Sequence, residues 1–298
     1  MIGSNVPTIG GFPTGFKTGD DWECECIQIY LTLSRRWIVP SLTEEKISLF
    51  KKAWSESSIK SVIAHVPFLV NLASINKELW KRSIERLVTE IKYANKLNVP
   101  FLVLHPGSYC DSKRESGLRR LIKGLNQVSE RIQETSAMIL LETMSGQGSM
   151  IGSTFREIKH ILNNLNNKKL FGVCLDTAHI FHAGYNIVGY KRYDKIIKEF
   201  DEIIGLDQLK VIHLNDSKTE LGSRNDRHAN IGEGKIGLQF FHAVLKDERF
   251  MDVPKILEIP ERDEKSKLSL ELLREIRDLD FVPEIKNFSI QLSIKEIY

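Results

Sequence analysis

The chain has 298 residues and a mass of 34.2 kDa, with 42% hydrophobic and 27% charged residues. This composition is typical of a globular enzyme and excludes a disordered, collagen-like or coiled-coil protein. No apolar run is long enough to span a bilayer, and the N-terminus lacks the pattern of a signal peptide, so we expect a cytoplasmic protein with no membrane partner. The net charge of +3 is too small to indicate a nucleic-acid partner by itself.

Short β-rich runs alternate with longer segments of helical period along the chain, which predicts βα units and a parallel sheet. The candidate strands, in chain order, are residues 2–6, 27–31, 61–66, 100–105, 138–143, 171–177, 209–216 and 254–259. Several, such as FLVLH and MILLE, are nearly continuous apolar runs, as expected for parallel strands buried on both faces. Apolar residues at steps of three and four over residues 80–94 and 118–132 predict amphipathic helices between strands.

Eight βα units predict an α/β fold of the (β/α)8 TIM barrel type, with the active site at the C-terminal ends of the strands. A doubly wound open sheet is the alternative. Because no linker rich in Pro, Gly and Ser divides the chain, we expect residues 1–279 to form a single catalytic barrel domain. Residues 280–298 lie beyond the eighth unit, and their FSIQLSI alternation predicts an edge strand or a docked tail of unknown role.

Side chains of the kinds that bind metal ions stand at or just after the ends of six predicted strands. They are His65, His105, Glu142, Asp176, His179, His213, Asp226, His228 and Glu258. A single strand-terminal His or Glu is usually a hydrogen-bonded structural residue. Nine together would each need a separate partner at one end of the barrel, because a polar group buried without a partner is costly. We therefore expect these side chains to form one site at the barrel mouth.

The nine side chains comprise five imidazoles and four carboxylates without a thiolate, a set that suits zinc, manganese or iron. An ion that keeps an open coordination position needs about three protein ligands, so nine groups can serve three ions. The spacings Asp176-x-x-His179 and Asp226-x-His228 each place two ligands on one short segment. Three divalent ions would outweigh the charge of four carboxylates, so the mouth should attract an anion such as phosphate. Clustered ions of this kind favour phosphate-ester hydrolysis.

Seven segments of the sequence carry a resemblance to one known family: HVPFLVNLAS, LHPGS, LETMSGQGS, GVCLDTAH, HLNDSK, GSRNDRHANIGEG and ILEIP. On these segments, residues 1–262 resemble the endonuclease IV family of AP endonucleases (AP endonuclease family 2), within the xylose-isomerase-like TIM barrel superfamily. The resemblance implies a monomeric DNA-repair enzyme that cuts double-stranded DNA 5′ to an abasic (AP) site and leaves a 3′-hydroxyl. It also implies three Zn²⁺ ions per chain, with Mn²⁺ or Fe as substitutes, and an accompanying 3′-repair diesterase activity.

The resemblance further implies how the nine ligands divide among the ions. One zinc would be bound by His65, His105 and Glu142. Glu142 would bridge to a second zinc, completed by Asp176, His213 and Glu258. The third would be bound by His179, Asp226 and His228. Glu142 is thus the expected catalytic bridging ligand, beside a metal-bound hydroxide that attacks the phosphorus.

Family members also insert side chains into DNA to hold out the abasic nucleotide, and Arg35, Phe68 and Leu69 occupy the matching positions. Arg227 lies in a loop on the expected active face and is a candidate phosphate contact. A core Phe-Leu pair and solvated arginines are the alternative interpretation. Two positions depart from the family pattern: Asn5 stands where relatives usually carry His, and Phe68 stands where Tyr is common.

Two other functions remain open. A sugar isomerase or epimerase of the same superfamily would need one or two ions, so the third set, His179, Asp226 and His228, distinguishes it from the endonuclease. A barrel that binds damaged DNA without cutting it is disfavoured because no ligand is missing. Residues 232–237 match GxGxxG, but they follow a ligand-bearing loop rather than a strand, which favours a turn before a helix over a nucleotide site.

Overall fold

Eight parallel strands close into a barrel in this computed structural model, which describes residues 1–110, 112–132, 135–259 and 264–283. Around the barrel the strand order is β1-β10-β7-β6-β5-β4-β3-β2, and every neighbouring pair is parallel. The strand bounds are β1 Ile2–Asn5, β2 Cys26–Ile29, β3 Ser61–His65, β4 Phe101–Leu104, β5 Met138–Glu142, β6 Phe171–Asp176, β7 Leu209–His213 and β10 Lys255–Leu257. The predicted (β/α)8 barrel is thereby confirmed, and the open sheet is excluded.

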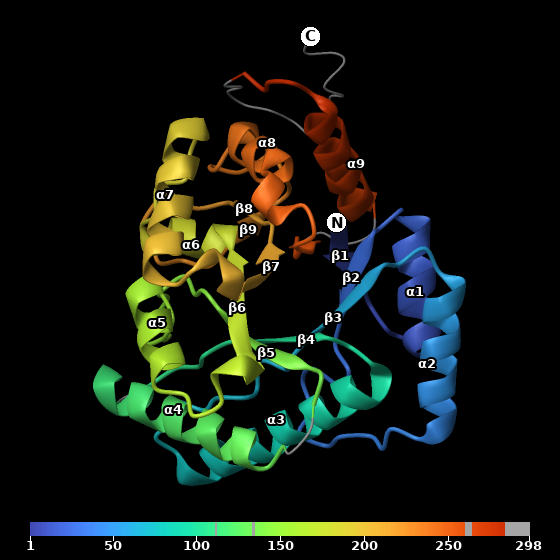
Figure 1. Ribbon diagram of the computed structural model, residues 1–298, viewed down its shortest axis with the longest axis vertical. Coiled ribbons are helices and arrows are strands. Elements are labelled where there is room, and N and C mark those ends of the chain that lie inside the picture. The colour runs from blue at the N-terminus through green and yellow to red at the C-terminus, as the bar shows by residue number, and fades with distance from the viewer. Residues whose placement is uncertain (111, 133–134, 260–263, 284–298) are drawn as a thin grey trace.

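Helices surround the strands on the outside of the barrel (Figure 1). Their bounds are α1 Phe12–Asp21, α2 Glu44–Glu56, α3 Lys77–Leu97, α4 Arg114–Glu130, α5 Phe155–Asn163, α6 Thr177–Ala183, α7 Tyr190–Ile203, α8 Leu238–Lys246 and α9 Glu264–Asp278, with short 3-10 turns at Lys168–Leu170, Leu206–Gln208 and Glu248–Phe250. Local sequence signals set the ends of α3. The Asn76 side chain accepts from the Leu79 amide at 3.0 Å, and Asn98 ends the helix in the left-handed conformation at φ 60°.

Several strands end earlier than the sequence predicts. The predicted strand 209–216 stops at His213, and Asp216 begins a separate two-residue strand. This strand, β8 Asp216–Ser217, pairs with β9 His228–Ala229 in an antiparallel ladder that returns the loop to the mouth. Of the predicted C-terminal tail, residues 284–298 lie outside the described residues. The described part docks at Val282, whose backbone amide donates to the Tyr190 hydroxyl at 3.0 Å.

The inside of the barrel has two levels. The lower level is a fully buried apolar layer, formed by Cys26, Ile63, Val103, Leu140, Cys174, Val211 and Ile256. Side chains alternate along a strand, so the residue two positions later points to the same interior, one step nearer the C-terminal end. Those residues are Gln28, His65, His105, Glu142, Asp176, His213 and Glu258. The strand period therefore places a ring of polar groups directly above the apolar layer.

Two further features concern the chain as a whole. The four cysteines, Cys24, Cys26, Cys110 and Cys174, are free thiols. Among the residues that the structure describes, no helix is both long and apolar enough to cross a membrane.

Lys255 is a buried lysine at the opposite, N-terminal end of the barrel. Only 2% of the residue is exposed, and its Nζ donates to the carbonyl oxygens of Phe250 and Val253. Burial lowers the pKa of the ammonium group from 10.5 to about 8. A lysine with a depressed pKa in the folded state destabilises the fold while it is charged, and this cost disappears as the pH rises through the folded pKa toward the unfolded one.

We therefore expect the free energy of unfolding of the wild type to rise, relative to Lys255→Met, by about 2 kcal/mol between about pH 7 and pH 9.5. Urea denaturation of both proteins at the two pH values measures this difference. Lys246→Met, at an exposed position of α8, is the matched control and should follow the wild type. A pH-independent difference between the wild type and Lys255→Met would contradict the prediction.

Candidate metal centre

The nine predicted ligands converge at the C-terminal mouth of the barrel. The mouth contains a cavity of about 230 Å³, lined by Ser4, Asn5, Tyr30, His65, Phe68, His105, His179, Asp226, His228, Glu258, Ile259 and Ser266. The remaining ligands, Glu142, Asp176 and His213, are fully buried beneath it. Three groups of potential ligand atoms within 4.8 Å of one another are present among the described residues: His65, His105 and Glu142; Glu142, Asp176, His213 and Glu258; and Asp176, His179 and His228.

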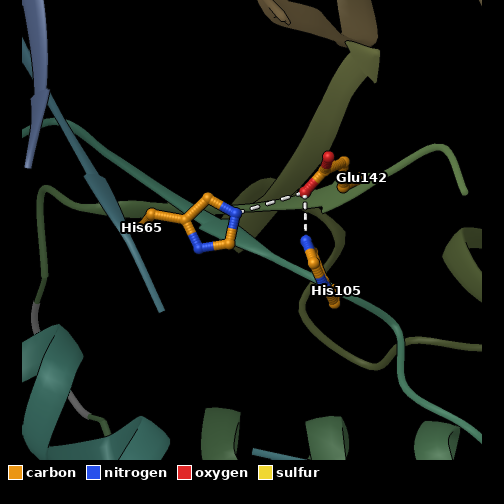
Figure 2. Close-up of side chains that lie close together, drawn as sticks. All are labelled: His65, His105 and Glu142. Atoms are coloured by element: carbon orange, nitrogen blue, oxygen red, sulfur yellow. Dashed lines mark hydrogen bonds and ion pairs between the residues drawn. The ribbon is translucent and has the colours of Figure 1, made fainter. Parts of the chain in front are cut away.

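Glu142 lies at the centre of the cluster, at the end of β5. Figure 2 shows His65, at the end of β3, and His105, directly after β4, approaching the same carboxylate oxygen. Their Nε2 atoms lie 3.3 and 3.0 Å from Glu142 Oε2. The other oxygen, Oε1, lies 3.2 Å from His213 Nδ1 and 3.2 Å from His179 Nδ1. One oxygen therefore faces His65 and His105 and the other faces His213, as expected of a carboxylate that bridges two ions.

A second set of ligands surrounds His213 at the end of β7. Its Nδ1 lies 3.1 Å from Glu258 Oε2 and 3.7 Å from Asp176 Oδ2. Asp176 also caps helix α6, because its Oδ1 accepts from the His179 amide at 2.7 Å. This cap fixes the first turn of α6 and places the His179 ring above the strand that bears Asp176. The spacing Asp176-x-x-His179 is thus a helix start that contributes two ligands.

The third set is brought to the mouth by the loop between β8 and β9. Asp226 lies between two imidazoles, with Oδ2 at 3.1 Å from His179 Nε2 and Oδ1 at 3.3 Å from His228 Nε2. The compact group that contains these histidines includes Asp176, so two carboxylates are candidates for the same position. His182, one turn after His179, is fully buried, and its Nδ1 lies 4.0 Å from Asp226 Oδ1.

Backbone carbonyls fix the orientation of three imidazole rings. The Nδ1 atoms of His65, His179 and His228 lie 2.8, 2.9 and 2.9 Å from carbonyl oxygens. A carbonyl oxygen can only accept, so Nδ1 carries the hydrogen and Nε2 of the neutral ring presents a lone pair to the carboxylates. Lone pairs and carboxylate oxygens at these distances repel one another unless a cation lies between them. The donor set therefore fits divalent metal ions.

His213 has the opposite orientation, which is set by Gln28. Its Nε2 lies 2.8 Å from Gln28 Oε1, while the Gln28 amide nitrogen donates to Glu258 Oε1 at 2.6 Å. Because the amide nitrogen is committed to Glu258, Gln28 Oε1 must accept from His213 Nε2–H. Nδ1 of His213 is then the atom that faces the carboxylates. Gln28 thus positions two ligands of the second set without being a ligand.

The pKa shifts agree with a centre that attracts positive charge. Burial raises the pKa of Glu142, but His105 and His213 outweigh burial and hold this pKa well below its usual value. Burial lowers the pKa of His228, but the hydrogen-bonding contact with Asp226 outweighs it and raises the pKa to about 9. In His179 burial is likewise outweighed, first by the charge of Asp176, and the pKa is raised well above its usual value. Metal ions would supply the positive charge that protons otherwise provide.

Sequence reasoning missed four residues that orient the ligands. Gln28 is one; the others are Asn215, Asp216 and Gln147. Asn215 donates from Nδ2 to Asp176 Oδ2 and accepts at Oδ1 from the Glu258 amide, both at 2.7 Å. Gln147 Oε1 accepts from the Asp226 amide at 2.7 Å. All but Gln28 lie within or beside the segments LETMSGQGS and HLNDSK, and their polar character at strand ends was the available signal.

Asp216 binds the backbone at the base of the loop that bears Asp226 and His228. Its buried carboxylate accepts from the amides of Ser217, Gly232, Gly234 and Ile236 at 2.8–3.1 Å. Residues 232–237, the GxGxxG match, wrap around this carboxylate and lead into α8. The glycines serve this turn, as the sequence predicts.

The four predicted DNA contacts lie in loops at the same end of the barrel as the ligands. Phe68 is 53% exposed and lines the metal cavity, and Leu69 follows it on the same turn with partial exposure. Arg35 is exposed in the loop after β2. Arg227 is exposed between two ligands, with Nη1 donating to the Asp226 carbonyl at 3.0 Å. Asn5 also faces the cavity, and its buried Oδ1 has no hydrogen-bond partner among the described residues.

Comparisons with known proteins agree with this geometry. The family model described as xylose isomerase-like TIM barrel matches residues 17–276. Probable endonuclease 4 of Geotalea daltonii is 37% identical over 277 residues, which cover 92% of this chain and 97% of that protein. Probable endonuclease 4 of Thermosipho melanesiensis is 37% identical over 268 residues, covering 89% and 94%. The crystal structure of endonuclease IV from Thermus thermophilus superposes with a TM-score of 0.80 at 27% identity, covering 93% and 98%. The chain therefore belongs to the endonuclease IV family of AP endonucleases, among the xylose isomerase-like TIM barrels.

Proposed function

We propose that this protein hydrolyses the phosphodiester bond 5′ to an abasic site in double-stranded DNA and leaves a 3′-hydroxyl. The observation that carries the proposal is the single cluster of five imidazoles and four carboxylates at the barrel mouth, with the exposed Phe68 at its edge. The membership of this chain in the endonuclease IV family supports the same reaction.

We assign the ligands to three zinc ions. The first would be bound by His65, His105 and Glu142, and the second by Glu142, Asp176, His213 and Glu258; these sets match two of the compact groups. The third would be bound by His179, Asp226 and His228, supported by the position of Asp226 between the two rings. Nitrogen and oxygen ligands without thiolates suit zinc, and Mn²⁺ or Fe are the alternatives.

Bound divalent ions would supply Lewis acidity and an activated water near neutral pH. The residues of the chain supply position. Glu142 keeps the first two ligand sets at a fixed separation, and the carbonyl-anchored rings of His65, His179 and His228 preserve the geometry of the donors. We propose that Phe68, Leu69 and Arg35 enter the duplex at the lesion and hold out the abasic nucleotide, while Arg227 contacts a phosphate.

The remaining parts of the proposal concern the setting of the reaction. We propose a monomer with one catalytic barrel over residues 1–279, acting in the cytoplasm on genomic DNA. The same centre would remove 3′-blocking groups at strand breaks, because this repair diesterase reaction also hydrolyses a phosphate ester next to a damaged sugar.

The test is incision of a labelled duplex that carries one tetrahydrofuran abasic analogue, with an undamaged duplex as control. The analogue cannot undergo β-elimination, so any cut reports hydrolysis. We expect one cut on the 5′ side, a 3′-hydroxyl product and about three metal ions per chain by elemental analysis. Chelation should abolish the cut, and zinc should restore it.

Failure of metal-loaded protein to cut the abasic duplex would overturn the proposal and direct attention to sugar isomerisation or epimerisation. His228→Asn separates the two reactions. It disrupts the third ligand set, so an endonuclease should lose activity, whereas an isomerase that uses one or two ions should retain it.

A further inference from the structure

Residues 31–41 follow β2, include Arg35 and are here called the β2 loop. Contacts with other parts of the chain fix the conformation of this loop. It lies beside the metal cavity: Tyr30 lines that cavity, and its ring centroid is 5.6 Å from that of His65. The loop contains no helix or strand, and a single backbone hydrogen bond joins two residues of 31–41, from the Arg36 amide to the Leu33 carbonyl at 3.4 Å. Something else must fix its conformation.

Arg86 on α3 provides that connection. The residue is 3% exposed, and its guanidinium points into the β2 loop from the helix side. Nη1 donates to the Arg36 carbonyl at 2.9 Å, and Nη2 donates to the Leu33 carbonyl at 3.1 Å and to the Thr32 hydroxyl. One side chain thereby satisfies backbone acceptors on both sides of Arg35. The rigid, forked guanidinium can make these contacts together, which an ammonium group cannot do.

Glu90 completes the buried unit one turn further along α3. Its fully buried Oε1 accepts from Arg86 Nε at 2.6 Å and from the Thr32 hydroxyl. The i,i+4 spacing places both side chains on the same face of the helix. Glu90 thus neutralises the buried charge and orients the guanidinium toward the loop.

Two neighbouring contacts extend the same face of α3. The Arg82 guanidinium lies 4.4 Å from the Trp37 ring centroid, and the Tyr93 hydroxyl donates to the Pro40 carbonyl at 3.0 Å. The whole loop is therefore seated against this helix, with Arg86 at the centre of the contact.

We propose that Arg86 is a positioning residue for DNA recognition: with Glu90 it fixes the β2 loop so that Arg35 is presented at the barrel mouth. This inference rests on the proposed function, in which Arg35 contacts DNA. Arg86 is buried and contacts no ligand of the metal centre. Its loss should therefore weaken recognition of the lesion while metal content stays unchanged.

The variant that tests the inference is Arg86→Met with Glu90→Leu. Removing both charges avoids an unpaired buried carboxylate, so the barrel should fold, while the polar contacts that Arg86 and Glu90 make with the loop are lost. The matched control is Arg131→Met with Glu85→Leu. This pair also joins α3 by a bidentate contact, at 2.6 and 2.7 Å, but is exposed and does not touch the β2 loop. Arg86→Lys is a third variant, in which the charge pair persists without the fork.

The first readout is independent of activity. Trypsin cleaves after arginine, and Arg35 and Arg36 are both exposed. We expect limited digestion followed by mass spectrometry to show cleavage at these two bonds about tenfold faster in the double variant, and at the wild-type rate in the control. An unchanged rate would overturn the inference, whether or not the protein cuts abasic DNA.

The second readout is a double-mutant cycle on the tetrahydrofuran duplex. We expect the double variant to raise KM about tenfold with a much smaller change in kcat, and Arg86→Lys to restore little of the loss. Arg35→Ala should raise KM in the wild type but add less than about twofold in the double variant, because the arginine is no longer positioned. Additive effects of the two changes, or an unchanged KM, would overturn the inference. Absence of incision by the wild type would instead reject the proposed function and leave the digestion to decide about the loop.

Discussion

Glu142→Gln is expected to lower the rate of abasic-site incision by roughly 1,000-fold or more, which exceeds the usual cost of losing a group that merely orients a ligand. Glu142 is fully buried, and its two oxygens lie within 3.3 Å of nitrogen atoms from four histidines. An amide has one good acceptor and no negative charge, so it cannot serve two ions together. If its nitrogen took the place of Oε2, it would face the Nε2 lone pair of His65. We therefore expect loss of bound metal along with activity.

Elemental analysis and single-turnover kinetics measure both effects. Glu130→Gln, at an exposed position of α4, makes the same chemical change and should leave both quantities at the wild-type values. Full metal content with strongly reduced activity would place Glu142 in the chemistry but not in metal binding. Wild-type activity would contradict the bridging role altogether.

Gly234→Ala is also expected to have a large effect, although Gly234 is not a candidate ligand. A Cβ at this position would lie 2.2 Å from Asp216 Oδ1 and 2.6 Å from the Ser217 carbonyl oxygen. The four backbone amides that surround the Asp216 carboxylate must then move apart. The base of the loop that bears Asp226 and His228 moves with them. We expect a loss of about 2–3 kcal/mol in unfolding free energy and a fall of roughly 100-fold in incision.

The metal content should distinguish this variant from Glu142→Gln. In the proposed assignment only the third ligand set depends on the loop, so Gly234→Ala should lose about one of three ions and retain the other two. Lys235→Ala is the control, because this neighbouring side chain is exposed and makes a surface ion pair with Glu220. A uniform loss of all three ions would show that the loop supports the whole centre.

The fold and the clustering of the candidate ligands at the barrel mouth were predictable for the same physical reason. In β3 the interior side chains are Ile63 and then His65, and in β5 they are Leu140 and then Glu142. An apolar run that ends in one residue of a metal-binding type indicates a buried strand. It also indicates the point at which that strand reaches the barrel mouth. The strand limits were less predictable. Residues 209–216 look like one continuous strand in the sequence, but in the structure β7 ends at His213 and β8 begins at Asp216.

Gln28, unlike the other residues that orient the candidate ligands, could not be identified from the sequence. Gln28 contacts His213 across 185 positions of the chain, and nothing near residue 28 indicates that a neutral amide will select the ring nitrogen that faces the metals. The carbonyl oxygens that accept from Arg86 lie 50 and 53 positions away in the chain. A guanidinium that binds carbonyl oxygens leaves no pattern in the side chains of the loop. Such contacts depend on the closed barrel and become visible only when it is formed.

The apolar layer inside the barrel also affects how metal ions enter and leave the site. Side chains such as Ile63, Leu140 and Val211 close the barrel below the ligands, so the mouth is the route by which a metal ion can reach the buried sites. DNA lying across the mouth would obstruct that route. Ion exchange should then be fast in the free protein and slow in its complex with DNA, so the enzyme would load its metals between encounters with damage and retain them through each one.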